Sequence, residues 1–355
     1  MEYISVKEAA QKWGVSSRRV ASLCTQERIE GAMRVGNMWI IPATVGKPED
    51  ARHTRYDERT KDATKPFLKW AGGKSQLLGE IRSRYPFDGK ITKYAEPFVG
   101  GGAVLFDVLA QHDLAEIYIS DRNRALINAY KAVRDDNEQL ISLLGEYQRQ
   151  YVPLDTEKRK KYYLKKREAF NERILLLNNE VDIQAAALLI FLNKTCFNGL
   201  YRVNRKGLFN VPMGSYKNPL ICDIDKLTFL SQQLADVEIV CGDYKESTAF
   251  IDNHTFVYFD PPYRPLTETA AFTAYTTGAF DDEEQRRLAI FCGECHEKGA
   301  KFLLSNADPK NVDINDNFFD DLYKGFHIER VEAARMINSK GSGRGKITEL
   351  LISNY

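Results

Sequence analysis

The sequence predicts an α/β fold, and three observations support this prediction. The apolar stretch Phe256–Phe259 stops at Asp260, which two prolines follow, and a strand cannot continue through two residues that lack amide donors. A short strand beginning at Tyr94 leads into glycines 100–102 and then into helical sequence. Helix and strand patterns alternate from residue 223 to the last strand. Asp260 is therefore expected at the carboxyl end of a buried strand, the edge of an open α/β sheet where ligands bind.

Length and composition exclude several classes of protein. The 355 residues suffice for two or three domains, and 50 Lys and Arg against 49 Asp and Glu leave no global field that would attract nucleic acid. The longest apolar run, Ala185–Leu192, is too short to span a bilayer, and the amino terminus lacks a basic segment followed by an apolar one. Six scattered cysteines are typical of reduced cytosolic thiols. We expect a cytoplasmic protein without a membrane segment.

One cysteine pair resembles a known attachment pattern. Cys292-Gly-Glu-Cys295-His296 matches the site for c-type haem and also a redox pair. It lies within the predicted helix 282–298, and no second cysteine pair completes a zinc site. We interpret the match as a chance occurrence on a helix and expect no metal.

The sequence of residues 1–45 indicates a separate module. Two short helices are expected, the second capped by Ser16 or Ser17, and residues 35–42 then form a strand that closes a hairpin or wing. This arrangement resembles the winged helix-turn-helix of the excisionase-like family, whose second helix enters the major groove of DNA. The alternative is a small helical module that binds protein. The residues that would contact DNA from the second helix are Arg18 and Arg19.

We expect residues 46–65 to form a linker, because they are polar, mixed in charge and almost free of large apolar side chains.

Two glycine-rich segments follow the linker. Gly72 and Gly73 allow a close approach to a ligand, and Lys74 places a cation at the start of a helix expected over residues 75–84. After the glycines at 100–102, a strand over residues 116–120 ends at Asp121, and an acid at the end of the second strand is the usual partner of ribose hydroxyls. No Lys-Ser/Thr pair follows these glycines, so the loop is not of the phosphate-binding type. A dinucleotide site stays open at this point.

Residues 131–222 interrupt the alternation. Segment 157–177 is rich in Lys and Arg, and a solvated helix face and a phosphate-contacting face are equally good interpretations. Segment 193–212 combines Asn, Arg and aromatic residues with glycines in a predicted hairpin. Asn and Arg read base edges bidentately, and a neighbouring ring can wedge into a base stack.

The carboxyl-terminal third supplies the remaining elements of the sheet. Gly242-Asp243-Tyr244 follows one of its strands, again at the edge where ligands bind. The expected elements are helices over 223–234 and 282–298, strands over 237–240, 301–305 and 346–353, irregular segments over 267–280 and 306–323, and a basic loop over 341–346.

Four segments of the chain form an ordered set: KWAGGK at 69–74, EPFVGGG at 96–102, FNGLYR at 197–202 and DPPY at 260–263. Taken in this order, they resemble the DNA adenine-N6 methyltransferases of the Dam type. Any one could arise by chance, but the ordered set is highly specific. The resemblance covers residues 66–355 and leaves out the amino-terminal module. It implies a Rossmann-like, seven-stranded, mostly parallel sheet in a catalytic domain (66–130 and 223–355), with a target-recognition domain of helices and a β-hairpin inserted at 131–222.

The resemblance also implies ligands and contacts. The implied cofactor is S-adenosylmethionine, with Asp121 on its ribose and Asp243-Tyr244 on its adenine, and the implied substrate is double-stranded DNA with a GATC or GAT-containing site. The family usually has tyrosine at Phe197, so the wedge is kept without the hydroxyl. The implied cofactor residues are Trp70, Lys74, Glu96, Phe98, Gly100, Gly102, Asp121, Asp243, Tyr244 and Asp260. The implied DNA contacts are Lys69, Phe197, Asn198, Leu200, Arg202 and Tyr216.

Catalysis is expected from Asp260, Pro261, Pro262 and Tyr263. Adenine N6 is a poor nucleophile, because its lone pair is delocalised into the ring. Asp260 and the Pro261 carbonyl can accept hydrogen bonds from the amino group and localise that lone pair, while Tyr263 stacks on the flipped base. The rate then comes mainly from positioning and electrostatics, and neither a metal nor a cysteine nucleophile is needed.

Other functions remain open on the sequence alone. A nicotinamide oxidoreductase would share the glycine loop and Asp121 but has no use for the DPPY segment. A cytosine-N4 methyltransferase more often has serine in place of Asp260. A catalytically silent DNA-binding regulator would explain only the amino-terminal module. The enzyme could act alone, protect DNA against a cognate restriction endonuclease or regulate genes, and we expect a monomer in a bacterial or phage-infected cytoplasm.

Overall fold

The computed structural model describes residues 3–15, 17–25, 28–36, 38–48, 64–264, 280–334 and 346–355, without the side chains of residues 18, 22, 333, 334 and 346. Most of the predicted linker and of the loops expected over 267–280 and 341–346 lies outside these residues.

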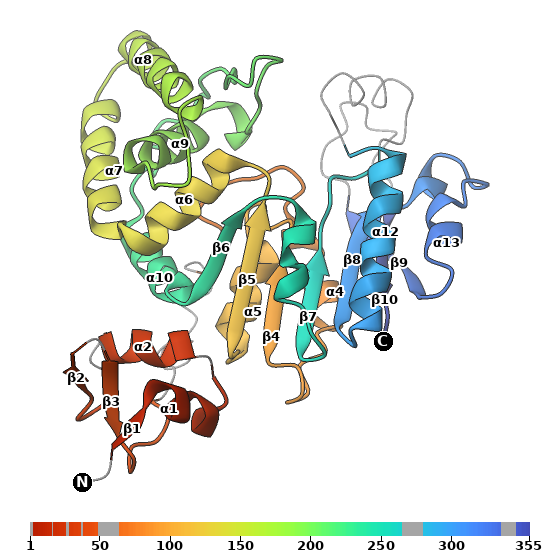
Figure 1. Ribbon diagram of the computed structural model, residues 1–355. Helices are drawn as coiled ribbons and strands as arrows, with labels where there is room; N and C mark the ends of the chain where they lie inside the picture. Colours follow the sequence, from red (N-terminus) through yellow and green to blue (C-terminus); the bar gives the residue numbers. More distant parts are fainter. Residues whose placement is uncertain are drawn as a thin grey trace.

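A seven-stranded sheet forms the centre of the chain (Figure 1). Its order is β6-β5-β4-β7-β8-β10-β9, with the first five strands parallel and β10 antiparallel to both of its neighbours. Parallel strands end at one edge of a sheet, so the residues that follow β4, β5 and β7 meet there. The predicted α/β class is confirmed. The strands are β4 (Lys93–Glu96), β5 (Glu116–Asp121), β6 (Val237–Cys241), β7 (Thr255–Phe259), β8 (Lys301–Ala307), β9 (His327–Ala334) and β10 (Lys346–Ser353).

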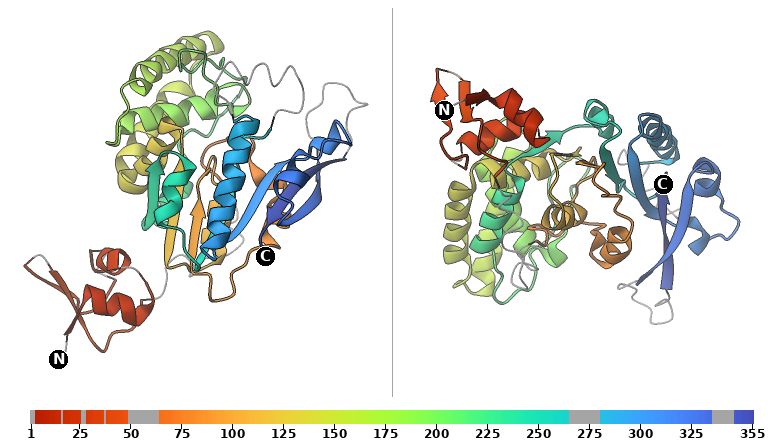
Figure 2. Two further views of the ribbon diagram at one scale, coloured as in Figure 1. Left: turned by 45° about the vertical axis from the view of Figure 1, so that its right-hand side comes forward. Right: turned by 90° about the horizontal axis from the view of Figure 1, so that it is seen from below.

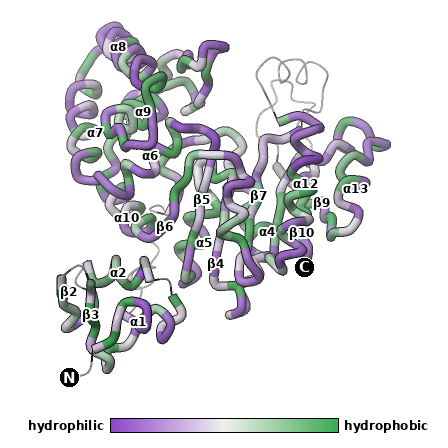
Figure 3. The backbone as a smooth tube through the Cα atoms, in the orientation of Figure 1, coloured by the Kyte–Doolittle hydropathy of each residue, from purple (hydrophilic) through white to green (hydrophobic). Residues whose placement is uncertain are grey.

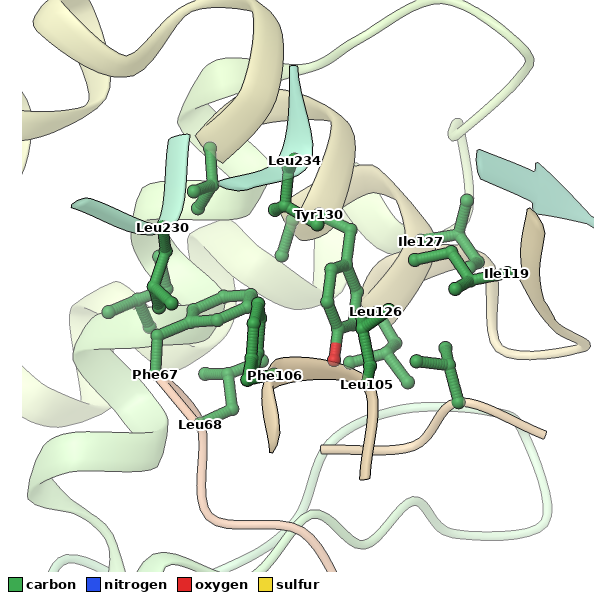
Figure 4. Close-up of a cluster of buried hydrophobic side chains, with 14 of the residues drawn as sticks. Phe67, Leu68, Leu105, Phe106, Ile119, Leu126, Ile127, Tyr130, Leu230 and Leu234 are labelled. Atoms are coloured by element: carbon green, nitrogen blue, oxygen red, sulfur yellow. The ribbon is translucent and has the colours of Figure 1, made fainter. Parts of the chain in front are cut away.

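Alternating side chains of the strands build a core on each face of the sheet. In β7, Phe256 and Tyr258 join one core, while Val257 and Phe259 join the other. The first core includes α5 (Ala103–Gln111), α6 (Arg124–Asp135) and α10 (Ile224–Leu234), and Figure 4 shows part of it around Phe106 and Tyr130. The second includes α12 (Asp282–Glu297) and α13 (Phe318–Leu322). Because both faces are covered, the central strand β7 is buried along its whole length rather than alternating between buried and exposed residues.

The insertion predicted at 131–222 is helical and ends in a hairpin. It contains α7 (Asn137–Tyr151), α8 (Thr156–Ile174), α9 (Ile183–Thr195) and the short η2 (Phe197–Gly199). Helix α9 is buried nearly all round and hydrophobic, whereas α8 is largely hydrophilic (Figure 3). Two α8 side chains support the hairpin: the Tyr163 hydroxyl donates to the Val211 carbonyl at 2.9 Å, and Asn171 exchanges two hydrogen bonds with the Phe209 backbone.

The amino-terminal module has its own small core beneath a three-stranded sheet of order β1-β3-β2. Arg19 pairs with Asp236, which precedes β6, and Lys47 Nζ lies 3.1 Å from Asp113, which precedes β5. Both partners lie at the amino ends of the parallel strands, so the module lies away from the edge that carries Asp260 (Figures 1 and 2). Its elements are β1 (Tyr3–Ser5), α1 (Val6–Trp13), α2 (Ser17–Thr25), β2 (Met33–Val35) and β3 (Met38–Pro42).

Several elements differ from the sequence-based expectation. The helix predicted over 75–84 is two short pieces, η1 (Lys74–Gln76) and α4 (Leu78–Arg82). The strand predicted over 35–42 is not continuous, because Val35 belongs to β2 and β3 begins at Met38. The segment expected to be irregular over 306–323 contains α13. Strands β1 and β9 were not predicted; β9 is an edge strand bonded only to β10, and its charged residues mask its strand pattern. The remaining short helices are η3 (Tyr244–Ala249) and η4 (Pro309–Asn311).

The cysteine pair of α12 belongs to the core. Cys292 and Cys295 are both buried and free, in the second core. Burial raises the pKa of both thiols. Among the described helices, none is long and apolar enough to cross a membrane.

Candidate active site

A cavity of about 930 Å³ opens at the carboxyl edge of the sheet. It collects residues that end or follow strands β4, β5, β6 and β7, as the sheet order requires, together with residues from segment 66–75 and Phe280. One predicted cofactor residue, Asp243, is not among its lining residues. The predicted residues that line the cavity are Lys69, Trp70, Lys74, Glu96, Phe98, Gly100, Gly102, Asp121, Tyr244, Asp260, Pro261, Pro262 and Tyr263.

The Asp260 carboxylate, whose side chain is 19% exposed, is held on one of its oxygens. Lys74 Nζ lies 2.6 Å from Oδ1, and the Ser305 hydroxyl donates to the same oxygen at 3.1 Å. Burial raises the pKa of Asp260, while the Lys74 cation and the Ser305 hydrogen bond act in the opposite direction. Lys74 itself is fixed by a 2.8 Å hydrogen bond to the Gly72 carbonyl, so the first glycine segment places its cation on the carboxylate.

Polar side chains brace the turn that carries Asp260, and apart from Tyr263 sequence reasoning missed all of them. The Tyr258 hydroxyl lies 3.0 Å from Ser305 Oγ, and Gln285 Nε2 donates to the Pro262 carbonyl at 3.2 Å. Tyr263 donates its hydroxyl to Glu349 Oε2 at 2.6 Å, which fixes one end of its ring. A polar residue such as Ser305 at the end of an apolar strand was the available signal, but only the pairing of β7 with β8 shows what it contacts.

The glycine loop is locked by the second acid of the site. The Asp121 carboxylate accepts hydrogen bonds from the Gly100 amide at 3.2 Å and the Asn123 amide at 2.8 Å. Burial raises the pKa of Asp121, and these two amides oppose the shift. Gly102 has φ +76°, and a Cβ there would lie 2.5 Å from the Tyr130 hydroxyl, so the loop excludes side chains at this position. The result is a backbone cradle beside a carboxylate.

The opposite wall of the cavity is aromatic. The rings of Phe98 and Tyr244 lie 5.3 Å apart. The neighbouring Asp243 carboxylate pairs with Arg122 and, at 2.9 Å, with Arg287. Burial alone would raise the pKa of Asp243, but the bonds from Arg287, the Lys245 amide and Arg122 outweigh it and lower the pKa to about 2.

The predicted DNA contacts gather in residues 197–216, which we call the recognition segment. Phe197 and Leu200 are 52% and 41% exposed, unusual for large apolar side chains, and Asn198 adopts φ 56° between them. Arg202 is exposed, and its Nε donates to Asn210 Oδ1 across the hairpin at 2.8 Å. Lys69 joins this group from the catalytic domain, with its Nζ 5.5 Å from the centroid of the Tyr216 ring.

The two arginines of the amino-terminal module do not join this group. Arg19 pairs with Asp236 near the opposite edge of the sheet, and the Arg18 side chain lies outside the described residues. In the described chain, no three or more His, Cys, Asp or Glu side chains form a cluster that could hold a metal ion.

Comparison with known proteins agrees with this geometry. The family described as D12 class N6 adenine-specific DNA methyltransferase matches residues 70–337. The chain is 49% identical over 296 residues to the type II methyltransferase M.MjaIII of Methanocaldococcus jannaschii, covering 82% of this chain and 99% of that protein. It is 39% identical to the type II methyltransferase M1.LlaDCHI of Lactococcus lactis subsp. cremoris, over 84% of this chain and 98% of the relative. It is 34% identical to the DNA adenine methylase of Escherichia coli K12, over 80% and 93%. The chain therefore belongs to the D12 class of N6 adenine-specific DNA methyltransferases, and it methylates adenine N6 in DNA.

Proposed function

We propose that the cavity binds S-adenosylmethionine beside a flipped-out adenine and that Asp260 activates the adenine amino group. The observation that carries this proposal is the meeting of the glycine loop, Asp121 and the Asp260 turn in one cavity of about 930 Å³. When bound, S-adenosylmethionine supplies the methyl group on a sulfonium centre.

The residues present fit that cofactor. The loop around Gly100 and Gly102 leaves room only for backbone, which allows a ligand to approach closely. Asp121 offers a carboxylate to ribose hydroxyls. Phe98 and Tyr244 provide flat surfaces for adenine, and aromatic faces near Trp70 attract a cation. Glu96, which also lines the cavity, is buried and accepts a hydrogen bond from the Tyr94 hydroxyl.

Asp243 has a supporting place in this proposal. Its carboxylate is engaged by Arg122 and Arg287, and it caps the helix η3 that begins with Tyr244. We assign it to the adenine end of the cofactor as the residue that fixes Tyr244 in the wall.

The catalytic step depends on which oxygen of Asp260 is free to accept. Lys74 and Ser305 both occupy Oδ1, so Oδ2 is offered to the adenine amino group together with the Pro261 carbonyl. Accepting both N–H bonds localises the nitrogen lone pair for attack on the methyl carbon, and Tyr263 holds the base by stacking. A buried carboxylate that must be ionised for this task needs the two donors on Oδ1.

Replacing Ser305 by alanine should therefore shift the acid limb of the pH–rate profile upward. The change removes a donor that stabilises the Asp260 carboxylate, so the pKa of Asp260 rises further and ionisation requires higher pH. Loss of one hydrogen bond to a charged group corresponds to a shift of roughly one pH unit. Methylation rates of wild type, S305A and S305T from pH 5 to 9 measure it. S305T keeps the donor and should follow wild type; an unshifted S305A profile with a uniformly lower rate would contradict the role.

We propose that residues 131–222 are the target-recognition domain and that the target contains GATC or begins with GAT. Phe197 would wedge into the base stack, while Asn198, Leu200 and Arg202 face the bases from the recognition segment and Lys69 and Tyr216 contact the flanking DNA. Single-molecule sequencing of DNA from an adenine-methylation-free host that expresses this chain tests the proposal. We expect methyl groups only on adenine within one GAT-containing motif. Modified cytosine, or modified adenine in motifs without GAT, would contradict it.

We further propose that the enzyme protects DNA against a cognate restriction endonuclease. Two of the relatives are named type II methyltransferases, and both are more similar to this chain than the adenine methylase of E. coli K12. Genomic DNA from the expressing host should then resist an endonuclease that cuts the sequenced motif.

The amino-terminal module is proposed as a winged helix-turn-helix that tethers the enzyme to DNA. Helix α2 would exchange the Arg19–Asp236 pair for phosphate contacts, with Arg18 beside it. Tethering raises the local concentration of DNA without new contacts at the target.

A variant without residues 1–60 should keep a similar turnover rate but bind DNA more weakly and with a flatter salt dependence. No residue of the module lines the catalytic cavity, so turnover should not depend on it. The proposed phosphate contacts of α2 belong to the module, so their loss should weaken DNA binding. Fluorescence anisotropy of both proteins across a salt series measures the effect. Equal affinities and slopes would mean that the module binds protein, and an insoluble variant would show that Arg19 and Lys47 join the module to the catalytic domain as one folding unit.

A further inference from the structure

We propose that Tyr201 and Asn193 are positioning residues that join the recognition segment to the wall of the cofactor cavity, so that cofactor binding and target reading strengthen each other. This inference rests on the proposed function, since it assumes a nucleoside cofactor in the cavity and DNA on the recognition segment.

The first connection runs through two stacked rings. Tyr201 lies on Trp70, with ring centroids 4.9 Å apart and planes 23° from parallel. Trp70 lines the cavity, and a Cβ on Gly100 would come within 3.2 Å of Trp70 Cδ1, so the indole packs against the glycine loop on one side and on Tyr201 on the other. Tyr201 itself does not line the cavity.

Tyr201 contacts a second residue of the cavity wall. Its pKa is raised by burial, and a side-chain hydrogen bond with Asn123 acts in the opposite direction. Asn123 lines the cavity and donates its amide to Asp121, the proposed ribose partner. One side chain of the recognition segment thus stacks on Trp70 and lies close to Asn123.

The second connection is the side chain of Asn193, which is only 2% exposed at the end of α9. Its Oδ1 accepts from the Lys69 amide at 2.9 Å, and its Nδ2 donates to the Lys69 carbonyl at 2.8 Å and the Gly199 carbonyl at 2.9 Å. The buried side-chain amide of Asn193 therefore binds both the backbone of Lys69, the residue before Trp70, and the backbone of the recognition segment at Gly199. Such a network transmits a shift of either backbone to the other, because an unpaired buried amide is costly.

Gly199 shows how closely the two segments approach. It has φ +66°, and a Cβ there would lie 2.5 Å from Lys69 Cδ. The exposed readers Leu200 and Arg202 flank Tyr201 directly in the chain. A ligand that orders Trp70 therefore also orders the backbone between Leu200 and Arg202, which raises the affinity for DNA. By linkage, DNA bound to these two residues must raise the affinity for the cofactor by the same factor.

The experiment uses the full chain and S-adenosylhomocysteine, which fills the cavity without reacting. Its Kd is measured by calorimetry under three conditions. The first has no DNA, the second has a duplex that contains the sequenced target motif, and the third has a duplex whose motif is scrambled. The ratio of the first Kd to the second is the coupling factor. For wild type we expect a factor of about 5 or more with the target duplex, the usual lower range for coupled sites, and a factor near 1 with the scrambled duplex.

Three variants test the residues. Y201L removes the ring stack and should bring the coupling factor to within about twofold of 1, while its Kd for S-adenosylhomocysteine alone stays within a few-fold of wild type. Y201F keeps the stack and should stay within about threefold of the wild-type factor. G199A acts on the second connection, because its methyl group displaces Lys69, and it should also lower the factor. Thermal unfolding of each variant confirms that it is folded.

The possible outcomes distinguish failure of this inference from failure of the proposed function on which it rests. A wild-type chain that binds neither S-adenosylhomocysteine nor the target duplex would remove the proposed function. A wild type that binds both with a coupling factor of 1, or Y201L and G199A variants as strongly coupled as wild type, would overturn the inference alone. If one variant fails to fold, the other decides the question.

Discussion

Asp260→Ala should abolish methyl transfer while leaving the affinity for S-adenosylmethionine near that of wild type. The carboxylate accepts from the adenine amino group in the proposed geometry, and its loss removes several kcal/mol of transition-state stabilisation, on the order of a hundredfold or more in rate. Asp260 pairs with Lys74, whereas the glycine loop and Asp121, which are hydrogen-bonded to each other, are the residues proposed to hold the cofactor. A tritiated-methyl assay measures the rate, and calorimetric titration measures cofactor binding.

The matched control is Asp260→Asn, which keeps the shape and one acceptor but not the charge. We expect it to retain a small residual rate, between those of wild type and the alanine variant. A turnover rate of the Asp260→Ala variant close to that of wild type would show that another group activates the adenine amino group. Loss of cofactor binding in both variants would instead show that Asp260 supports the cofactor site, either directly or through its ion pair with Lys74.

Arg202→Ala should relax discrimination at one base pair of the target by about 1–3 kcal/mol, which is about 5- to 150-fold in relative rate. The Arg202 side chain is exposed and oriented across the hairpin by Asn210, so in the proposed complex it is already positioned before DNA binds. Losing a bidentate contact removes the advantage of the correct base and leaves the other positions unchanged. Rates on a set of duplexes, each with one substituted base pair, locate the affected position.

Arg205→Ala is the control for charge. Arg205 is exposed near the tip of the same hairpin, so its removal costs phosphate attraction without a predicted loss of reading. It should weaken binding to all duplexes equally and flatten the salt dependence. If Arg202→Ala behaves in the same way, with uniform weakening and intact discrimination, then Arg202 contacts phosphate rather than a base.

The strands and the positions of the acids were largely predictable. Buried apolar runs that end in Asp121 and Asp260 leave few alternatives, because a parallel strand buried on both faces is short and continuously hydrophobic. The family followed from the order of four short segments, and the comparisons confirm it. The sequence could not show β9 in the same way, since an edge strand bonded on one side tolerates charged residues.

By itself, then, the sequence determined the α/β class and the methyltransferase family, and it was the source of the proposed roles of Asp260 and Arg202, because these depend on residues close together in the chain. The tertiary structure alone decided which distant side chains meet. Ser305 reaches Asp260 only because β8 pairs with β7, and Tyr201 reaches Trp70 only because α9 returns the chain to the glycine loop. Such contacts are set by sheet order and helix packing, which follow from the burial of the whole chain and leave no local pattern in the residues that make them.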